Sequence, residues 1–423
     1  MYIIIGIILV LMMFSVPVTF SIGIGSILYC FLVGIDSIVL PQRIFVSLDV
    51  FSLLAIPLFL FAGNLMNISG ITMRILNFSR NLVGYITGGL GHVNVLASMI
   101  FAGMSGSAVA DAAGLGVIEL EMMTKGGFDK EFSAAITLAS ATLGPIIPPS
   151  IMLVIYATVS NASVGRLLLA GLFPGIVMGI SLMIMVYIIA RKKKYPKEKW
   201  PGIKNILISF KDAFLPLLTP VIVIGGIMFG ILTPSEAGAI ASLYALILGS
   251  IVYRKIKIKD LYKVLLDTAL TTGMIGLLIG VSSVFAWIIT IEGIPQKLAT
   301  AILLFTTNKF VVLILIDILV LILGCFVDSG PLLVLLVPIF LPLLNIMNID
   351  IVHFGIIITV GVMIGEITPP FGMCLYTISG ISNIGIEKIA KAVLPFFFML
   401  VISLLIFTFL PILSIFLPNI IFG

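Results

Sequence analysis

Long apolar stretches run through almost the whole chain and limit what it can fold into more than any other feature. Of its 423 residues, 61% are hydrophobic and only 10% are charged, whereas a soluble domain carries about 25% charged residues. Such a chain has too little polar surface to stay in water, so it belongs in a lipid bilayer. At about 20 residues for each helical span, it has room for roughly a dozen crossings or partial crossings.

Basic residues gather in two short segments, residues 191–211 and 254–263, which hold thirteen of the 23 Lys and Arg residues. By the positive-inside rule, both segments are predicted to be cytoplasmic. Nucleic-acid binding is the other common interpretation of a basic run, but the position of these segments beside apolar spans disfavours it. The first residues, MYIIIGIILVLMMF, lack the basic region and cleavage site of a signal peptide, so they are predicted to form a retained first span.

Helix breakers and charges together predict two halves of opposite orientation. In the first half, residues 88–124 form a hairpin that opens from the cytoplasm, and residues 131–160 form a crossing helix broken by Pro145, Pro148 and Pro149. In the second half, residues 309–346 form a hairpin that opens from outside, and residues 353–382 form a crossing helix broken by Pro369 and Pro370. This pattern is an inverted-topology repeat, which many secondary transporters share.

The remaining segments complete an all-α polytopic membrane protein. Residues 167–190, 264–291 and 392–418 are each expected to cross once, and residues 212–253 twice. The topology of residues 1–85 stays open, although Arg43, Arg74 and Arg80 suggest interfacial helices. The chain is accordingly divided into N-terminal scaffold helices, a first repeat, cytoplasmic loops with a scaffold helix pair, and a second repeat, at residues 1–87, 88–190, 191–263 and 264–423.

The two proline breaks are the first candidate binding elements. Backbone polar groups in hydrocarbon must be satisfied, so broken helices belong inside protein or beside a cavity. Each proline removes an N–H donor and frees a carbonyl about one turn earlier. Freed carbonyls with the hydroxyls of Thr142, Ser150 or Thr368 suit a hard cation such as Na⁺. A plain proline kink is the simpler explanation of one break, but two breaks matched by the repeat favour function.

The hairpin tips are the second candidate elements. Residues 103–111, with Asp111, and residues 327–331, with Asp328, both concentrate small and hydroxyl residues. Small residues allow close packing, and a helix N-terminus offers N–H groups to an anion. An ionised carboxylate in apolar surroundings is costly, which makes both aspartates functional candidates. Helix capping is the alternative role for them, and Asp317 and Glu366 are weaker candidates.

An enzyme is the rival class. Residues 103–106, Gly-Met-Ser-Gly, resemble the GxSG of intramembrane serine proteases, with Ser105 as nucleophile. A serine nucleophile needs a histidine base within hydrogen-bond reach, and only His92 and His353 are present. The three cysteines (Cys30, Cys325, Cys374) and the two histidines show no CxxC or HExxH metal spacing. A transporter without enzymatic activity is therefore expected.

Longer motifs resemble the large membrane subunit of tripartite ATP-independent periplasmic (TRAP) transporters. The resemblance covers effectively the whole chain. It runs through AIPLF and AGNLM (55–66), GGL and VNVLASM (88–99), SGSAVADAA (105–113), GPIIPPS (144–150), TPSEA (233–237), HFG (353–355) and TPP (368–370).

The resemblance implies an elevator-type fold in which both hairpins and both broken helices form the mobile transport domain. It implies sodium symport of a small organic anion in the bacterial inner membrane. The partners would be a periplasmic binding protein and a small membrane subunit of about four helices. Since no small subunit is fused to this sequence, a separate one is expected. A stand-alone Na⁺/dicarboxylate symporter is the alternative, and the substrate stays open among C4-dicarboxylates, sialic acids and keto acids.

The resemblance also implies site residues, because each family sodium site lies where a hairpin tip meets the broken helix of its own repeat. The first sodium site would use Ser105, Gly106, Ser107, Thr142 and Pro145. The second would use Gly324, Val327, Asp328, Thr368 and Pro369. Substrate would lie between the tips, near Ser107, Asp111, Ser150 and Ser329. Gly361, Glu366 and Cys374 depart from the family pattern around the second break.

Overall fold

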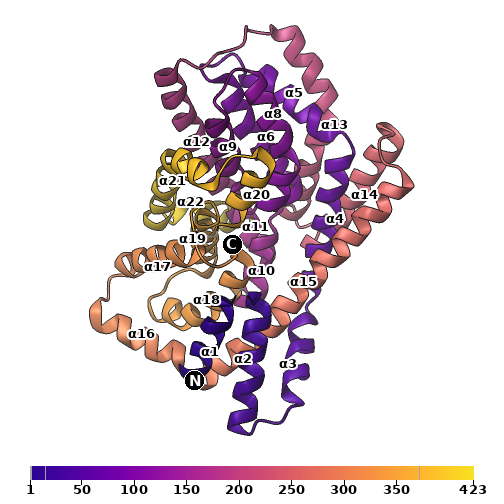
Figure 1. The fold of residues 1–423 in the computed structure, drawn as a ribbon. Coiled ribbons are helices and arrows are strands. Elements are labelled where there is room, and N and C mark those ends of the chain that lie inside the picture. Colours follow the sequence, from indigo (N-terminus) through magenta and orange to yellow (C-terminus); the bar gives the residue numbers. More distant parts are fainter. Residues whose placement is uncertain (1, 15, 371) are drawn as a thin grey trace.

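The fold is built from helices that enter, cross or bend back within an apolar layer. The structure is a computed structural model that describes residues 2–14, 16–370 and 372–423. Within these ranges it contains helices and no strand, and seven of the helices are long and apolar enough to span a bilayer. The prediction of an all-α polytopic membrane protein is therefore confirmed (Figure 1).

A group of scaffold helices lies along one side of the two repeats. Within it, α4 packs along α14, α5 packs against α13, and the long α15 crosses α2, α3 and α4. The scaffold elements are α1 (Tyr2–Met13), α2 (Val18–Val33), α3 (Val39–Leu48), η1 (Phe51–Leu54), α4 (Ala55–Ile68), α5 (Ile71–Val83), α13 (Ile203–Met228), α14 (Pro234–Ile247), η2 (Leu248–Val252) and α15 (Ile258–Ile291). The sequence-based division places residues 264–291 of α15 in the second repeat, but this helix packs along the scaffold helices. The helix after it, α16 (Ile294–Phe305), packs on α18 of the second hairpin.

The first repeat contains the predicted hairpin and broken helix. Its hairpin descends through α6, turns at a tip near residue 106, and returns through α7 and α8. Its crossing helix is split into α9 and α10 by the proline break. The elements are α6 (Gly89–Ser105), α7 (Ala108–Ala113), α8 (Leu115–Lys125), α9 (Lys130–Ala141), α10 (Ile151–Ser160), α11 (Val164–Ala170) and α12 (Leu172–Lys193).

The second repeat has the same parts upside down. Its elements are α17 (Lys309–Gly324), α18 (Ser329–Ile346), α19 (Ile351–Gly365), α20 (Met373–Ser382), α21 (Ile386–Phe409) and α22 (Ile412–Phe422). The repeats interlock, because α10 packs against α18 of the other hairpin and α20 packs against α7. Both α10 and α20 end at an asparagine in the left-handed conformation, Asn161 and Asn383. The inverted repeat with two hairpins and two broken helices is thus present.

The expected first span differs from the structure. At 1.5 Å per residue, the twelve residues of α1 reach only about 18 Å, which is less than the ~30 Å hydrocarbon core. Pro17 stands directly before α2 and, since proline cannot continue a helix, the chain turns back there. Ile4 and Ile8 of α1 then pack with Ile22 of α2. The last predicted span is also shorter, because α21 ends at Phe409 just before Pro411.

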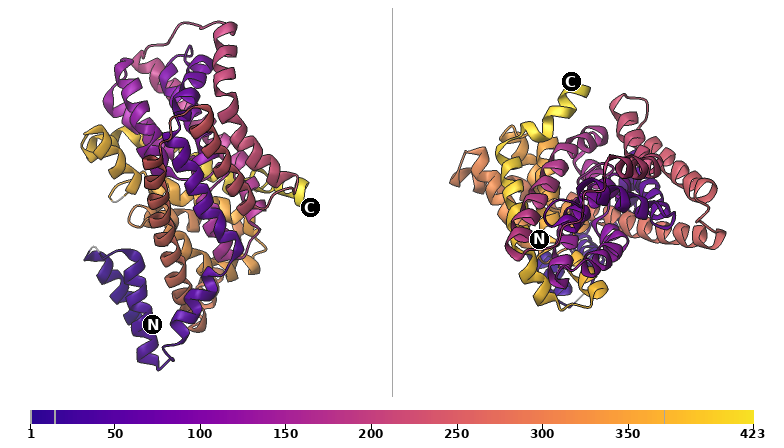
Figure 2. Two further views of the ribbon diagram at one scale, coloured as in Figure 1. Left: turned by 90° about the vertical axis from the view of Figure 1, so that its right-hand side faces the viewer. Right: turned by 90° about the horizontal axis from the view of Figure 1, so that it is seen from above.

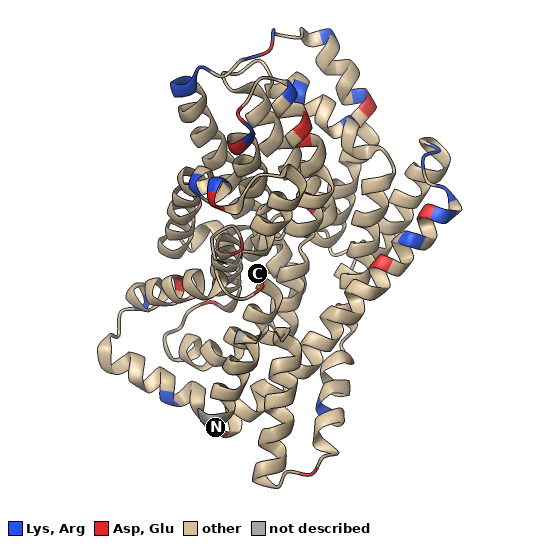
Figure 3. Ribbon diagram, in the orientation of Figure 1, with Lys and Arg blue, Asp and Glu red and all other residues tan. Residues whose placement is uncertain are grey.

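Basic residues gather toward one end of the molecule. Most Lys and Arg residues lie in the upper half of Figure 3, while α1 to α3 occupy the opposite end (Figures 1 and 2). At the basic end Asp129 Oδ2 accepts hydrogen bonds from Lys193 Nζ and Tyr195 Oη, both at 2.6 Å. The first of these bonds is the larger cause of the lowered pKa of Asp129. These bonds tie the start of α9 to the end of α12.

Candidate functional site

The first tip is bonded to the first break through its backbone. Gly106 ends α6 with φ +66, a conformation that glycine adopts without steric cost. Its carbonyl accepts a hydrogen bond of 3.3 Å from the Ile151 N–H at the start of α10. A Cβ at this position would collide with the Pro149 carbonyl oxygen. The sequence therefore needs glycine here for its backbone conformation and for the close approach of the tip to the break.

Asp111 lies buried behind this tip. Its side chain is 2% exposed, and its Oδ1 accepts a hydrogen bond from Ser105 Oγ. Its other oxygen, Oδ2, is buried and has no hydrogen-bond donor among the described residues. Oδ2 faces the break, because a Cβ added to Gly144 would lie only 2.6 Å from it. A buried carboxylate oxygen without a donor is costly unless a cation or a proton compensates it.

Hydroxyl groups around the first break hold the local backbone. Ser150 caps α10 by accepting a 3.1 Å bond from Leu153 N, and its Oγ donates to the Pro145 carbonyl. Thr142 Oγ1 donates to the Ala139 carbonyl at 2.7 Å. Ser107 caps α7. These hydroxyl oxygens keep lone pairs that can face an ion while their protons are used within the protein.

At the second junction, side chains hold the tip and the break together. Cys325 Sγ lies 2.9 Å from Thr368 Oγ1, which also donates to the Gly365 carbonyl at 2.7 Å. Glu366 is buried, and its Oε1 accepts a 3.1 Å hydrogen bond from the Ser329 N–H at the start of α18. Its Oε2 accepts from Cys374 Sγ at 3.4 Å. Two of the three residues that depart from the family pattern, Glu366 and Cys374, therefore belong to the contact between tip and break.

The Asp328 carboxylate completes the second junction. It stands at the N-cap position of α18 but makes no capping hydrogen bond. It lies near Glu366, because both residues line one cavity and Glu366 Oε1 accepts the N–H of Ser329, the residue after Asp328. Like charges on two neighbouring carboxylates repel each other, and a cation between them would remove that repulsion. The second junction is thus richer in acid than the first.

A cavity of about 260 Å³ lies between the two tips and the scaffold. Ser107 comes to it from the first tip, and Asp328 and Ser329 from the second, with Glu366 from the second break. Apolar side chains from α4, α10 and α15 close the other sides. The described residues that line it include no Lys, Arg or His. The cavity therefore combines two acidic side chains, two serines and an apolar wall.

Some of the predicted site residues line this cavity and others do not. Of the predicted substrate residues, Ser107 and Ser329 line it, whereas Asp111 and Ser150 lie behind the lining and bond within their own repeat. Of the predicted sodium ligands, Gly106, Ser107, Pro145 and Asp328 line the cavity. The others, away from the lining but on the tips or breaks, are Ser105, Thr142, Gly324, Val327, Thr368 and Pro369. Their binding roles stay predictions.

Some residues in or near the candidate site could not be predicted from the sequence. Thr271 of α15 lines the cavity from the scaffold, and only tertiary packing brings it there. Cys325 contacts the second break, although a single cysteine in an apolar run gives no signal. Glu119 of α8 is 1% exposed and accepts a 3.5 Å hydrogen bond from Ser98. Its burial follows from the packing of α8 on α9, which the residues next to it in sequence do not indicate.

The hydrogen bonds of Ser105 bear on the protease hypothesis. Its Oγ donates to Asp111 and accepts from Ser107 N at 3.5 Å. His92 Nε2 contacts the Thr87 carbonyl at 3.2 Å. Both ring nitrogens of His353 are buried without a partner in the described part of the chain. Neither histidine is hydrogen-bonded to Ser105 there, so this arrangement lacks the serine–histidine contact that nucleophilic catalysis requires.

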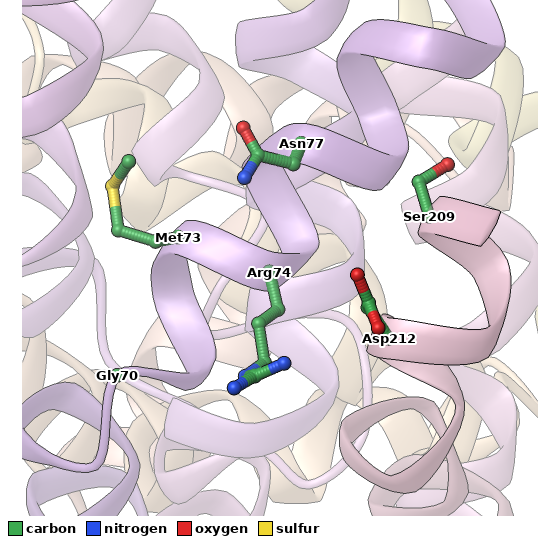
Figure 4. Close-up of a pocket in the computed structure, with 6 residues that line it drawn as sticks. All are labelled: Gly70, Met73, Arg74, Asn77, Ser209 and Asp212. Carbon is green, nitrogen blue, oxygen red and sulfur yellow. The ribbon is translucent and has the colours of Figure 1, made fainter. Parts of the chain in front are cut away.

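A further cavity, of about 300 Å³, opens between α5 and α13 near the basic end. Figure 4 shows Arg74 and Asn77 on one helix and Ser209 and Asp212 on the other. The Arg74 guanidinium lies 4.1 Å from the ring centre of Tyr253. This cavity shares no lining residue with the one between the tips, as far as the chain is described. It is separate from the candidate site.

Comparison with known proteins agrees with this architecture. Residues 5–413 match the sequence profile of the family described as tripartite ATP-independent periplasmic transporter, DctM component. The chain belongs to this TRAP transporter family. It is 43% identical over 410 residues to the sialic acid TRAP transporter large permease protein SiaM of Vibrio cholerae, covering 97% of this chain and 96% of that one. This TRAP subunit is therefore a large permease subunit and a multi-pass membrane protein.

Other relatives of this TRAP subunit differ in their substrates. The C4-dicarboxylate TRAP transporter large permease protein DctM of Pseudomonas aeruginosa is 37% identical over 400 residues, covering 94% of each chain. Among solved structures, the Alcanivorax borkumensis YdaH transporter aligns with a TM-score of 0.65 at 12% identity, covering 88% of this chain and 87% of that one. This last likeness shows a shared transporter fold.

Proposed function

We propose that this TRAP large permease subunit carries a small organic anion into a bacterial cell, driven by entry of Na⁺ across the inner membrane. The observation that supports this most is the acidity of the cavity between the hairpin tips. An anion placed beside Asp328 and Glu366 meets like charge and no basic side chain of the described lining. Only bound cations or protons reverse that repulsion, so anion binding and cation binding are coupled there.

Sodium is the cation that the donor groups fit. Each junction combines backbone carbonyls at a proline break with hydroxyl groups and a carboxylate, which are hard oxygen donors. Asp111 Oδ2, without a donor in the described structure, and Asp328, without a capping bond, provide charge for one cation at each junction. Na⁺ is the cargo that crosses the membrane with the anion, with no chemical change in either.

Movement of the repeats against the scaffold supplies alternating access in this proposal. The two hairpins and two broken helices interlock through α10 with α18 and α20 with α7, which suits motion as one body. Such an elevator carries both junctions and the cavity past α4 and α15. Neutralised tips fit this movement, because an uncompensated carboxylate is costly to move through an apolar layer.

The substrate and partners are inferred from the relatives. Their names specify sialic acid and C4-dicarboxylates, so the substrate class is a carboxylate. The TRAP assignment supports two partners, a small membrane subunit and a periplasmic binding protein that delivers the anion. The chain is reconstituted in liposomes with each partner added or omitted, using radiolabelled sialic acid and succinate. Uptake that needs neither partner supports the stand-alone symporter.

The site proposal is tested by Ser105→Ala. The change removes the donor to Asp111 Oδ1 and a hydroxyl beside the first tip, so sodium-dependent uptake is expected to fall at least about tenfold, as for a lost hydrogen bond to a charged group. Ser133→Ala is the matched control, since Ser133 is similarly buried on α9 but bonds the Asp129 carbonyl at the cytoplasmic end. Uptake by Ser105→Ala equal to that of the control contradicts the first sodium site.

A further inference from the structure

A cavity of about 440 Å³ opens at the end of the molecule opposite the basic segments. It lies between α3, α10, α15 and α18, and we call it the outer cavity. It is lined by Asn161, which caps the end of α10, and by Thr290, near the end of α15. The cavity therefore lies where these two apolar helices end. With the basic segments in the cytoplasm, the outer cavity is on the periplasmic side.

The outer cavity lies next to the cavity between the tips, on its periplasmic side. On α10 the lining passes from Ile155 to Thr158, and on α15 from Leu278 to Ser282. On α18 it passes from Pro331 to Val334. A step of three or four residues along a helix is one turn, about 5 Å. The same three helices thus carry both cavities in adjacent layers, the outer one nearer the periplasm.

The lining of the outer cavity suits a hydrophilic anion. Arg43 is its one charged residue among the described residues that line it, and none of the described ion pairs includes Arg43. Its guanidinium lies 4.9 Å from the ring centre of Trp287, which fixes its position by a cation–π contact. Hydroxyl or amide groups of six further residues also line the cavity, and apolar side chains from all four helices line the remainder. The six are Ser47, Thr158, Asn161, Ser282, Ser283 and Thr290.

Ser282 independently indicates that the outer cavity can bind a polar ligand. It is 1% exposed, and its Oγ is buried with no hydrogen-bond partner in the described part of the chain. A buried hydroxyl left without a partner costs free energy, and a polar ligand or water in the outer cavity removes that cost. The Arg43 guanidinium and this hydroxyl therefore border the same space.

We propose that the outer cavity is a transient subsite where Arg43 holds the carboxylate of the arriving anion before it moves one layer inward to the tips. The inference rests on the proposed function. It also explains how an anion approaches an acidic inner cavity: a guanidinium binds it first, outside, and the final step follows only once cations occupy the junctions. Arg43 is exposed enough to meet the anion in water, and arginine suits carboxylate recognition by its planar donors.

The first experiment compares Arg43→Gln with Arg74→Gln in liposomes that contain the complete transporter, with radiolabelled sialic acid or succinate, whichever the unchanged protein carries. Both arginines stack on an aromatic ring beside a cavity, but Arg74 lies at the cytoplasmic end. Arg43→Gln is expected to raise KM about tenfold, with little change in the maximal rate. Arg74→Gln is expected to leave both constants unchanged.

A charge-rescue experiment separates this role from a structural one. Arg43→Cys is treated with a methanethiosulfonate reagent that attaches either an ethylammonium or an ethylsulfonate group. The positive group is expected to restore most of the lost uptake and the negative group to lower it further. The unchanged protein receives the same reagents, because its own Cys325 is partly exposed.

The outcomes distinguish the two proposals. Normal KM in Arg43→Gln, or equal effects of both attached groups, overturns the subsite while sodium-driven uptake stands. A changed half-saturating concentration of binding protein at saturating anion overturns it too, because Arg43 then serves docking. If the unchanged complete transporter shows no sodium-driven uptake of either anion, the proposed function itself is contradicted. At constant Na⁺ concentration, lower ionic strength should accelerate uptake at low anion concentration in the unchanged protein and not in Arg43→Gln.

Discussion

Replacing Asp328 with asparagine is expected to reduce sodium-dependent uptake by about 10- to 100-fold, the size expected when a bond between a charged group and its partner, here the proposed Na⁺, is lost. The new amide would keep an oxygen at the N-cap of α18 but would lack the negative charge that faces the second junction. Since Asp328 makes no capping hydrogen bond, the helix itself should be little affected. Insertion into the membrane and chromatographic behaviour are therefore expected to stay normal.

The measurement is initial uptake as a function of Na⁺ concentration in liposomes with the complete transporter. Loss of a sodium ligand raises the Na⁺ concentration needed for half-maximal uptake, whereas loss of folded protein lowers the rate equally at every concentration. Asp267→Asn is the matched control, because Asp267 is exposed near the cytoplasmic end of α15. A normal sodium curve for Asp328→Asn removes this carboxylate from the coupling mechanism.

Much of the fold is predictable because prolines, glycines and lysines mark its boundaries. The Pro-Pro pairs lie in the breaks that follow α9 and α19, and the small residues near Gly106 turn the first hairpin. The two basic segments then fix which face each hairpin opens from, through the positive-inside rule. The error at α1 came from counting apolar residues without giving weight to Pro17, which keeps that helix short.

The candidate site is less predictable because it depends on side-chain direction within irregular backbone. Ser150 and Ser107 are both hydroxyl residues beside a break or tip, yet Ser107 lines the cavity and Ser150 bonds the Pro145 carbonyl. Local sequence does not separate these outcomes. Contacts between distant elements decide the rest, such as the bond from the Ser329 N–H to Glu366 across the second junction.

The second junction also depends on a close crossing of α17 and α19 at two glycines, Gly324 and Gly365. A Cβ added to Gly365 of α19 would lie 2.5 Å from the Gly324 Cα of α17, and one added to Gly324 would lie 3.0 Å from the Gly365 Cα. The obstacle is backbone, which cannot rotate away. Gly365→Ala is therefore expected to push the two helices apart and to destabilise the protein by about 1–3 kcal/mol.

Separation of these helices should disturb transport as well as stability. The Cys325–Thr368 contact at 2.9 Å and the Ser329–Glu366 hydrogen bond at 3.1 Å lie next to the crossing, so both are expected to lengthen. Under the proposed function, weaker holding of the tip is expected to lower the sodium affinity of this junction. Thermal unfolding of the purified variant, with and without Na⁺, should show a lower midpoint and a smaller gain from Na⁺ than the unchanged protein.

Gly380→Ala is the control that makes this result specific to the crossing. Gly380 lies in α20 with no heavy atom within 4 Å of its added Cβ. The same substitution there should stabilise the helix by about 0.5–1 kcal/mol, because alanine is a better helix former than glycine. The two changes are thus expected to shift the unfolding midpoint in opposite directions. Shifts of the same sign and size would mean that the contact between α17 and α19 does not limit the space at Gly365.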